Sequence, residues 1–317
     1  MYHKKFYHGI MFHYFHGKGI HKKSQGSIDK NNLNKIIKKI GRSNILNADE
    51  FLNRHIEHKL KNSDVCFTFD DGLKSQYDIA LPVLEEHKIK SFFFVNTSIY
   101  TNEYNYTELF RLFRNNYFKD INEFYRKFFS LVDKNLDLFF ESEINNIRNA
   151  KLKFPYYSIN DLKFRAVRDK MLSNSEYQTI HFQMFKTKKF EYKKYQSMLY
   201  LSKQNLIQLN KLGHLVGLHS HSHSHKIETL LLKDQMKDYK KNLLILSKIL
   251  NKKNNQINYM SHPNGSYTPG TLKILKKLGI KFGFKQIMSI EKNKNMKKIN
   301  NSSLEIARNP HNNLIAK

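Results

Sequence analysis

Two adjacent carboxylates and a run of alternating histidines are the side chains of this 317-residue sequence best suited to chemistry. Asp70 and Asp71 follow the apolar run 65–69 and precede a glycine. The histidines alternate with serines and stand at four positions: His219, His221, His223 and His225. Carboxylates and neutral imidazoles are good ligands for Zn²⁺ and similar divalent ions. The two stretches together indicate a metal site if the fold brings them close.

The elements before these residues are predicted to bring them to one edge. The apolar run 65–69 ends in a turn signal, which is typical of a buried strand in a parallel sheet. Active sites of such folds lie at the carboxyl ends of the strands. Neighbouring side chains on a strand point in opposite directions, so Asp70 and Asp71 should have different roles. A simple Asp-Asp-Gly turn without chemistry is the alternative.

The histidine run follows a second predicted strand, at 214–218. Its spacing leaves the choice of ligands open. In a helix, positions 219 and 223 or positions 221 and 225 would form a pair, whereas in an extended chain all four would share a face. A third stretch, Ser-His-Pro-Asn-Gly-Ser-Tyr at 261–267, follows the strand-like residues 257–260.

In this order, the three stretches resemble the motifs of the polysaccharide deacetylases, the NodB-homology domains of carbohydrate esterase family 4. Residues 68–72 match the T-F-D-D-G motif of that family without a change. Residues 219–223 match its H-[ST]-x-[ST]-H motif, and residues 261–267 match a looser form of its Pro/Tyr/Gly motif. The resemblance covers roughly residues 1–100 and 200–317.

The resemblance implies a role for each residue of the first two motifs. Asp71, His219 and His223 would bind Zn²⁺, or another divalent ion such as Co²⁺, Ni²⁺ or Mn²⁺, and leave a position for water. Such an ion lowers the pKa of water towards ~7 and polarises an amide carbonyl. Asp70 would be the general base. His221 takes the variable position, and His225 is interpreted as a polar loop residue. A nonspecific His-rich metal binder is the alternative, against which the matching Asp-Asp-Gly argues.

The third motif departs from the family pattern. Many members begin it with an arginine that holds the base carboxylate, and Ser261 stands there in this chain. Arg308, at the end of a late strand, is our candidate for the missing guanidinium, with a surface cation as the alternative. Asn264 stands where tyrosine is common, so an oxyanion contact would come from its backbone N–H or its side chain. The substrate and oxyanion candidates are Pro263, Asn264 and Gly265.

Amide hydrolysis also needs an acid that protonates the leaving amine. The Leu-x-His motif that brings this acid in the family is not clear near the C-terminus. The chain resembles instead a circularly permuted branch with Tyr-His on the first strand, where this sequence has Phe12 and His13. We therefore assign the acid to His13, with His311 as the second candidate. A strand-end histidine bonded to the backbone is the alternative for His13.

Alternating strands and helices predict a parallel sheet with covering helices in one α/β domain over 1–317. The resemblance implies that this domain is a distorted (β/α)7-type barrel of the polysaccharide-deacetylase kind. The predicted strands lie at 9–13, 64–69, 91–95, 214–218, 257–260, 281–284 and 304–307, with a further candidate at 44–46. Residues 101–200 instead carry phenylalanines at helical spacing, which predicts a helical insertion. We expect this insertion to line the substrate cleft and set substrate choice. Residues 291–301, rich in lysine and asparagine, are predicted to be a loop.

The composition bears on partners and compartment. The net charge is +28, from 55 Lys and Arg against 27 Asp and Glu, which could attract anionic glycans, lipid-linked carriers or nucleic acid. The lysines are scattered and no nucleic-acid motif is found, so nucleic acid is not expected. No signal peptide or membrane span is recognised, so we expect a cytoplasmic protein with peripheral contact to an anionic membrane face. The single cysteine, Cys66, is interpreted as an inert core thiol.

The expected function is metal-dependent hydrolysis of an N-acetyl or O-acetyl group on a sugar. A polysaccharide, a glycolipid or an activated precursor would be the substrate, in the biosynthesis of a surface polysaccharide. Two other classes stay open: an amidohydrolase acting on a non-sugar C–N bond, and an inactive basic glycan-binding protein. The intact set of Asp70, Asp71, His219 and His223 argues against an inactive site.

Overall fold

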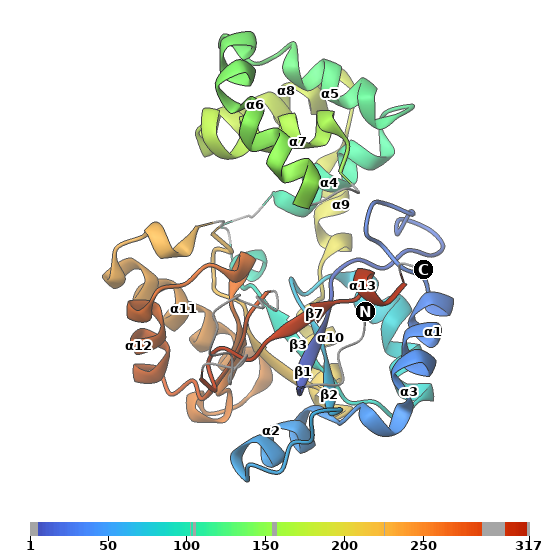
Figure 1. The fold of residues 1–317 in the computed structure, drawn as a ribbon, viewed down its shortest axis with the longest axis vertical. Helices are drawn as coiled ribbons and strands as arrows, with labels where there is room; N and C mark the ends of the chain where they lie inside the picture. The colour runs from blue at the N-terminus through green and yellow to red at the C-terminus, as the bar shows by residue number, and fades with distance from the viewer. Residues whose placement is uncertain are drawn as a thin grey trace. The chain divides into compact units, whose positions relative to one another are not determined.

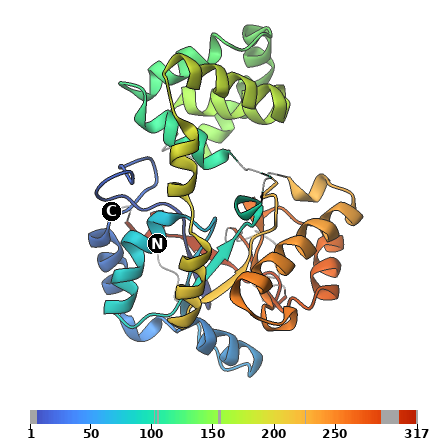
Figure 2. The ribbon, with the colours of Figure 1, turned by 180° about the vertical axis from the view of Figure 1, so that it is seen from behind.

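The computed structural model consists of two compact units. The barrel unit comprises Met1–Asn105 and Met198–Lys317, and the helical unit comprises Tyr106–Ser197. Figures 1 and 2 show the chain from two sides. The structure describes residues 6–101, 103, 106–153, 157–224, 226–286 and 302–315.

The barrel unit is built on a seven-stranded parallel sheet. Its strands are β1 (His8–Phe12), β2 (Val65–Phe69), β3 (Phe92–Val95), β4 (Leu215–Leu218), β5 (Tyr259–Ser261), β6 (Phe282–Phe284) and β7 (Arg308–Pro310). Their order is β6-β5-β4-β3-β2-β1-β7.

The chain just before β7 closes this sheet into a barrel. Ile306 forms a parallel bridge with Phe284 at the end of β6, and its N–H donates to the carbonyl of Gly283 at 2.8 Å. Two residues later the same segment becomes β7 and pairs with β1. The predicted (β/α)7-type barrel is therefore confirmed.

Burial explains why these short segments form strands. All residues of β2 and β3 are buried, and both strands consist mainly of aromatic and β-branched residues, which suit a strand covered on both faces. The rings of Phe92 and Phe94 lie 5.1 and 5.5 Å from that of Phe284 on β6. Aromatic packing between strands far apart in the sequence thus makes the core of the barrel.

Helices surround the strands of the barrel unit (Figures 1 and 2). They are α1 (Lys30–Ile40), α2 (Ala48–Ile56), α3 (Leu81–Glu86), α10 (Lys203–Lys211), α11 (Leu232–Leu250), α12 (Pro269–Lys277) and α13 (Asn312–Ile315). Helix α1 illustrates the sequence logic. The Asp29 side chain caps its first turn, its buried residues recur at helical spacing, and Gly41 follows its last residue at φ 88°.

Two strand predictions differ from the structure. The candidate strand at 44–46 is a 3-10 turn, Arg42–Asn44, followed by a single bridge between Ile45 and Val65. The last strand lies at Arg308–Pro310 rather than at 304–307, because only Ile306 of the earlier segment bridges to β6. The predicted loop at 291–301 lies outside the described residues.

The described part of the helical unit contains helices and no strand. These helices are α4 (Thr107–Asn116), α5 (Ile121–Phe129), α6 (Leu136–Lys153), α7 (Ile159–Ala166), α8 (Asn174–Thr187) and most of α9 (Tyr192–Leu199). Phenylalanines from different helices are buried together, as in the T-shaped pair of Phe128 and Phe164 at 4.8 Å. The unit therefore has an aromatic core of its own. None of the helices that the structure describes has the length and hydropathy needed to cross a membrane.

Candidate active site

The aspartate pair lies at the carboxyl end of β2, where the chain turns sharply. Asp71 has φ 75° and Gly72 has φ 63°, both in the left-handed region. A Cβ at Gly72 would approach Val95 to 3.0 Å. Both this close approach and the positive φ therefore favour glycine at position 72. The turn directs the two carboxylates to different partners, as the sequence predicts.

Asp70 forms a buried ion pair with Arg308. The guanidinium donates from Nη1 to Oδ1 and from Nη2 to Oδ2, both at 2.7 Å, and the exposed fractions of the two residues are 2% and 0%. Arg308 also donates to the Ser261 and Thr68 hydroxyls. The surface-cation interpretation of Arg308 is therefore wrong, and the structure brings the guanidinium to the carboxylate that the family pattern pairs with arginine.

This ion pair keeps Asp70 ionised. Burial by itself would raise the pKa of Asp70, but the nearby Arg308 and His219 more than offset that effect and hold the pKa below its ordinary value. A carboxylate held this way is charged near neutral pH and presents a fixed orientation.

A glycine on β1 makes room for the arginine inside the barrel. Gly9 pairs in register with Arg308, and a Cβ at Gly9 would lie 2.9 Å from the Arg308 Cγ. Any larger residue there would push the side chain away from Asp70 or deform the strand. The ion pair thus depends on a small residue on the neighbouring strand.

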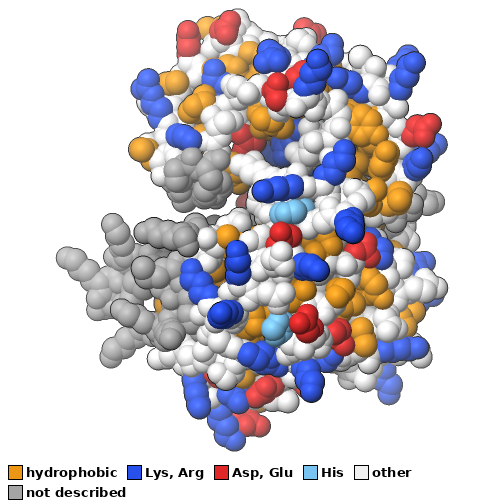
Figure 3. Space-filling model, turned by 90° about the vertical axis from the view of Figure 1, so that its right-hand side faces the viewer, with side chains coloured by type: hydrophobic (Ala, Val, Ile, Leu, Met, Phe, Trp, Pro, Cys, Tyr) orange, Lys and Arg blue, Asp and Glu red, His pale blue; other side chains and the backbone are white. Residues whose placement is uncertain are grey.

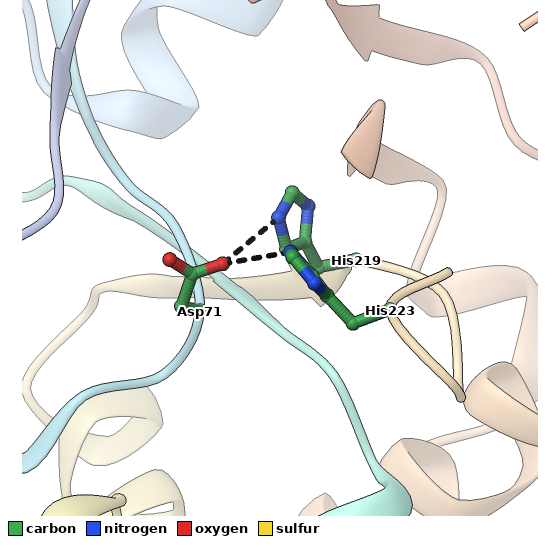
Figure 4. A group of neighbouring side chains, drawn as sticks. All are labelled: Asp71, His219 and His223. Atoms are coloured by element: carbon green, nitrogen blue, oxygen red, sulfur yellow. Dashed lines mark ion pairs between the residues drawn. The ribbon is translucent and has the colours of Figure 1, made fainter. Parts of the chain in front are cut away.

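Asp71, His219 and His223 converge on one point, as Figure 4 shows. The Nε2 atoms of His219 and His223 lie 3.2 and 3.0 Å from the same Asp71 oxygen, and the three ligand atoms lie within 4.8 Å of one another. Burial would raise the pKa of Asp71, but hydrogen bonds from the two imidazoles hold it well below its ordinary value.

The tautomer of His219 tests whether a metal ion fits this group. Its Nδ1 lies 3.0 Å from the carbonyl oxygen of Ser261, so Nδ1 carries the hydrogen and donates. Nε2 is then the ring atom that faces the Asp71 oxygen, 3.2 Å away, where a proton or a bound cation can bridge the two. One carboxylate and two imidazoles, one of them oriented by a backbone carbonyl, are a suitable donor set for a divalent cation.

The backbone of residues 219–223 decides which histidines converge, and it is neither helical nor extended throughout. Ser220 and His223 have φ 57° and 51°, in the left-handed region. His221 points elsewhere: its Nδ1 lies 2.9 Å from the Thr97 hydroxyl, and its Nε2 lies 3.1 Å from Glu103. The fourth histidine of the run, His225, lies outside the described residues.

Of the two acid candidates, only His13 faces the carboxylates. Its Nε2 lies 3.8 Å from Oδ2 of Asp70, and its side chain is 22% exposed. Burial lowers the pKa of His13, although Asp71 and Asp70 act in the opposite direction. The ring nitrogens of His311 each lie 3.1 Å from a backbone carbonyl oxygen, of Met11 and Gly26. Burial lowers the pKa of His311 to about 4, against the effect of these two carbonyls, and with both nitrogens turned to the backbone this histidine has a structural role.

The third motif contributes mainly through its first residue. The Ser261 hydroxyl donates to Oδ2 of Asp70 at 3.1 Å, while its carbonyl accepts from His219, so it links both halves of the site. Pro263, Asn264 and Gly265 form a 3-10 turn after β5, in which Asn264 is exposed with φ 53°. Among the described residues, no hydrogen bond joins Asn264 to the aspartates or to the two converging histidines.

Sequence reasoning missed the residues that support the site. In the sequence, Ser261 stands out only as a departure from the family pattern. In the structure it contacts both the base and a ligand histidine. Asn242 and Asp238 on α11 bind the backbone of the histidine loop. The only signal in the sequence is an asparagine, Asn242, among the apolar residues of what became α11. The spacing of residues cannot connect it to a distant loop.

The seven-stranded parallel barrel, with a carboxylate pair and two histidines at its strand ends, defines a deacetylase fold and site of the NodB kind. The profile of the polysaccharide deacetylase family matches residues 57–124 and 153–283, and the chain belongs to this family. The family assigns it to the deacetylases that act on sugars. No curated protein matches the chain.

Solved structures support the fold. The Streptococcus pyogenes deacetylase PplD in complex with acetate is 15% identical, with a TM-score of 0.55 over 97% of this chain and 95% of that one. The deacetylase domain of BpsB from Bordetella bronchiseptica is 11% identical, with a TM-score of 0.53 over 97% and 96%. IcaB from Ammonifex degensii is 15% identical, with a TM-score of 0.52 over 96% and 91%. At these identities the likeness is one of fold.

Proposed function

We propose that this protein is a metal-dependent hydrolase that removes acetyl groups from the amino groups of a sugar, with O-acetyl esters as a second substrate class. The observation that carries the proposal is the pair of imidazole nitrogens 3.2 and 3.0 Å from one Asp71 oxygen, next to the buried pair of Asp70 and Arg308. A cation site beside an ionised carboxylate is the arrangement that hydrolysis of an amide requires.

Asp71, His219 and His223 would hold the ion, which we propose to be Zn²⁺, with Co²⁺, Ni²⁺ and Mn²⁺ as substitutes. When bound, such an ion polarises the acetyl carbonyl and lowers the pKa of a water molecule. The Ser261 carbonyl accepts from Nδ1 of His219 and so turns Nε2 toward the site, and the Asp71 carboxylate supplies negative charge.

Asp70 would accept a proton from the attacking water as its oxygen bonds to the acetyl carbon. Two hydrogen bonds from Arg308 and one from Ser261 fix the orientation of the carboxylate before the reaction. Because Arg308 holds the pKa of Asp70 low, the base is charged at neutral pH without further activation.

His13 would protonate the nitrogen as the C–N bond breaks, which releases acetate and the free amine. Its Nε2 lies 3.8 Å from Asp70, so the acid and the base flank the same space. Pro263, Asn264 and Gly265, which form the turn after β5, would contact the substrate, with the oxyanion contact made by the backbone N–H or the side chain of Asn264.

The charge of the chain supports an anionic or lipid-linked carbohydrate, as in the biosynthesis of a surface polysaccharide. Lys and Arg exceed Asp and Glu by 28. In Figure 3 the Lys and Arg side chains are spread over the face shown rather than gathered in one patch. A spread of positive charge favours long-range attraction of an anionic substrate or membrane face over a single specific site.

Acetate release tests the proposal. We expect release from a panel of N-acetylated sugars and oligosaccharides, its loss with a chelator, and its return on adding Zn²⁺ or Co²⁺. Non-sugar amides and O-acetyl esters in the same panel separate the related hydrolases. If the protein binds the ion but releases acetate from no substrate with any metal, the result would favour a glycan-binding protein without catalysis.

A further inference from the structure

The loop that carries the two converging histidines is held by one helix outside the barrel. Asn242, on α11, is fully buried, and its Oδ1 accepts from the His219 N–H at 3.1 Å. Its Nδ2 donates to the Val95 carbonyl at 3.0 Å and to the Thr97 hydroxyl at 3.1 Å. One amide therefore ties the start of the histidine loop to the end of β3.

A second side chain of α11, Asp238, binds the middle of the loop. Its Oδ1 accepts from the His221 N–H at 2.5 Å, and its Oδ2 accepts from the Ser222 N–H at 3.1 Å. Asn242 and Asp238 stand four positions apart, so they lie on the same side of the helix. Together they bind three backbone N–H groups of the loop.

This loop needs such support because of its backbone. Ser220 and His223 have left-handed φ values of 57° and 51°, which non-glycine residues adopt only when their surroundings impose them. The turn at Ser220 carries the chain back so that His223 meets the Asp71 oxygen already facing His219. Without the bonds from α11, the loop keeps its bonds to Thr97 and Ser98 and the bond from the His223 N–H to the Ser220 hydroxyl, and we expect these to hold His223 less firmly against Asp71.

We propose that Asp238 and Asn242 are positioning residues that hold the histidine loop in its metal-binding form and so set the affinity of the site for divalent cations. The inference rests on the proposed function, since it assumes that Asp71, His219 and His223 bind an ion. Neither residue contacts that group with its own side chain; both act through the backbone of the loop.

The same helix offers a matched control. Gln235 is also buried, at 1% exposure, and its side chain makes two hydrogen bonds: it accepts from the Thr271 hydroxyl at 2.7 Å and donates to the Leu230 carbonyl at 2.9 Å. Gln235→Ala therefore removes a buried amide from α11 without touching the histidine loop.

The experiment compares Asp238→Ala, Asn242→Ala and Gln235→Ala with the unchanged protein. The dissociation constants for Zn²⁺ and Co²⁺ are measured by competition with a chelator, and thermal unfolding of the metal-free proteins is recorded alongside. We expect Asp238→Ala and Asn242→Ala to bind both ions about 10- to 100-fold more weakly, the usual effect of losing a group that orients a metal ligand. Gln235→Ala should lose thermal stability and keep its affinity.

The outcomes separate the inference from the proposed function. If the unchanged protein binds no ion, the metal site itself fails. If it binds ions and all three variants match it, or if all three lose affinity in proportion to their stability, the positioning role is overturned. Should Asn242→Ala not fold, Asp238→Asn decides, because it keeps the side-chain volume and removes one acceptor. We expect it to bind between the unchanged protein and Asp238→Ala.

Discussion

Each unit buries a carboxylate beside an arginine, and the surroundings of the two differ. In the barrel unit, Arg308 reaches Asp70 from a strand 238 positions away. In the helical unit, Arg165 pairs with Asp161 four residues earlier in the same helix, and Tyr125 donates to the second oxygen at 2.8 Å. Asp161 is surrounded by groups from neighbouring helices, Tyr125 of α5 and Arg114 of α4, whereas Asp70 faces His13 and Ser261. Both carboxylates are thus buried and paired with an arginine. The candidate site differs in that functional side chains from several strand ends converge on it.

Two buried histidines show the same contrast. His181 and His219 are 1% and 2% exposed. The Nδ1 of His181 bonds to the carbonyl of Tyr177 in its own helix, and its ring stacks on Phe110 at 4.1 Å. Burial lowers the pKa of His181 to about 3, so it serves as a neutral core ring. His219 instead bonds to a carbonyl from another strand, which leaves Nε2 facing Asp71.

The largest effect should come from removing the imidazoles of the barrel site. We expect the double variant His219→Ala, His223→Ala to lose its divalent ion and its deacetylase activity, with affinity reduced by more than the ~10²-fold typical of outer-shell changes. His181→Leu should keep metal and activity and change the free energy of unfolding by about 1–3 kcal/mol. Metal analysis and acetate release check both. Full metal content in the double variant would refute the ligand assignment.

Next in size is the loss of the base. Asp70→Asn should lower turnover by ~10²- to 10⁴-fold, the range for general acid–base catalysis, and retain the ion. Asp161→Asn, the matched change in the helical unit, should leave turnover unaltered at temperatures where the protein is folded. Steady-state kinetics with metal analysis distinguishes them. If Asp70→Asn lost the ion while Asp71→Asn kept it, the roles of the two carboxylates would be reversed.

Removal of the acid should have a smaller effect that depends on substrate. His13→Ala should slow amide hydrolysis by about 10²-fold, at the low end for acid catalysis, because an amine is a poor leaving group without a proton. Activated esters should be affected much less, since their leaving groups need little protonation. Rates on paired N-acetyl and aryl-acetate substrates measure this difference. Full amidase activity in His13→Ala, with loss in His311→Ala, would move the acid to the other histidine.

The smallest effect concerns the pH dependence of the Asp70 ion pair. The pKa of Asp70 is depressed in the folded protein, so the pair stabilises the fold above the unfolded pKa of ~3.9 and loses this effect as the pH falls through the lowered value. Arg308→Lys should weaken the pair and raise the pKa, which moves the acidic limb of activity and stability to higher pH by about one unit or less.

Arg165→Lys provides the control for that pH shift. The Arg165 pair is formed within a single helix of the helical unit, so its replacement should leave the acidic limb of the activity profile in place. Profiles of kcat/KM and thermal midpoints between pH 3 and 7, conditions chosen around the ordinary carboxyl pKa of ~4, check both variants. An identical acidic limb in Arg308→Lys and the unchanged protein would show that Arg308 does not control the charge of Asp70.

Local signals in the sequence were enough to predict a parallel sheet with covering helices and the positions of the two main motifs, and the family resemblance added the closed barrel. Residues 65–69 are an apolar run that ends in a turn signal, and the structure has β2 at Val65–Phe69 with the aspartates directly after it. The histidines likewise follow β4, as the pattern predicts. Such signals lie within a few residues of the groups they place, which explains why they can be read from the sequence alone.

Features that depend on contacts between residues far apart in the sequence could not be derived from local signals. Spacing left the choice between histidines open, because it does not reveal the left-handed residues Ser220 and His223 or the bonds from α11 to the same loop. The last strand shifted from 304–307 to Arg308–Pro310, since pairing with β1 overrides the weak strand preference of asparagine and proline. The helical unit, in contrast, begins and ends at Tyr106 and Ser197, a few residues inside the interval 101–200 that the helical spacing of the phenylalanines predicts.

The long sequence separation between the base and its arginine has a consequence for how the protein folds. A folding chain can assemble β1 to β6 around Asp70 and still lack the guanidinium that keeps this carboxylate charged, because Arg308 arrives only when β7 pairs with β1. Contacts between such distant residues form late, since they require closure of a long loop. Recovery of activity during refolding should therefore lag behind recovery of secondary structure and report the moment at which the barrel closes.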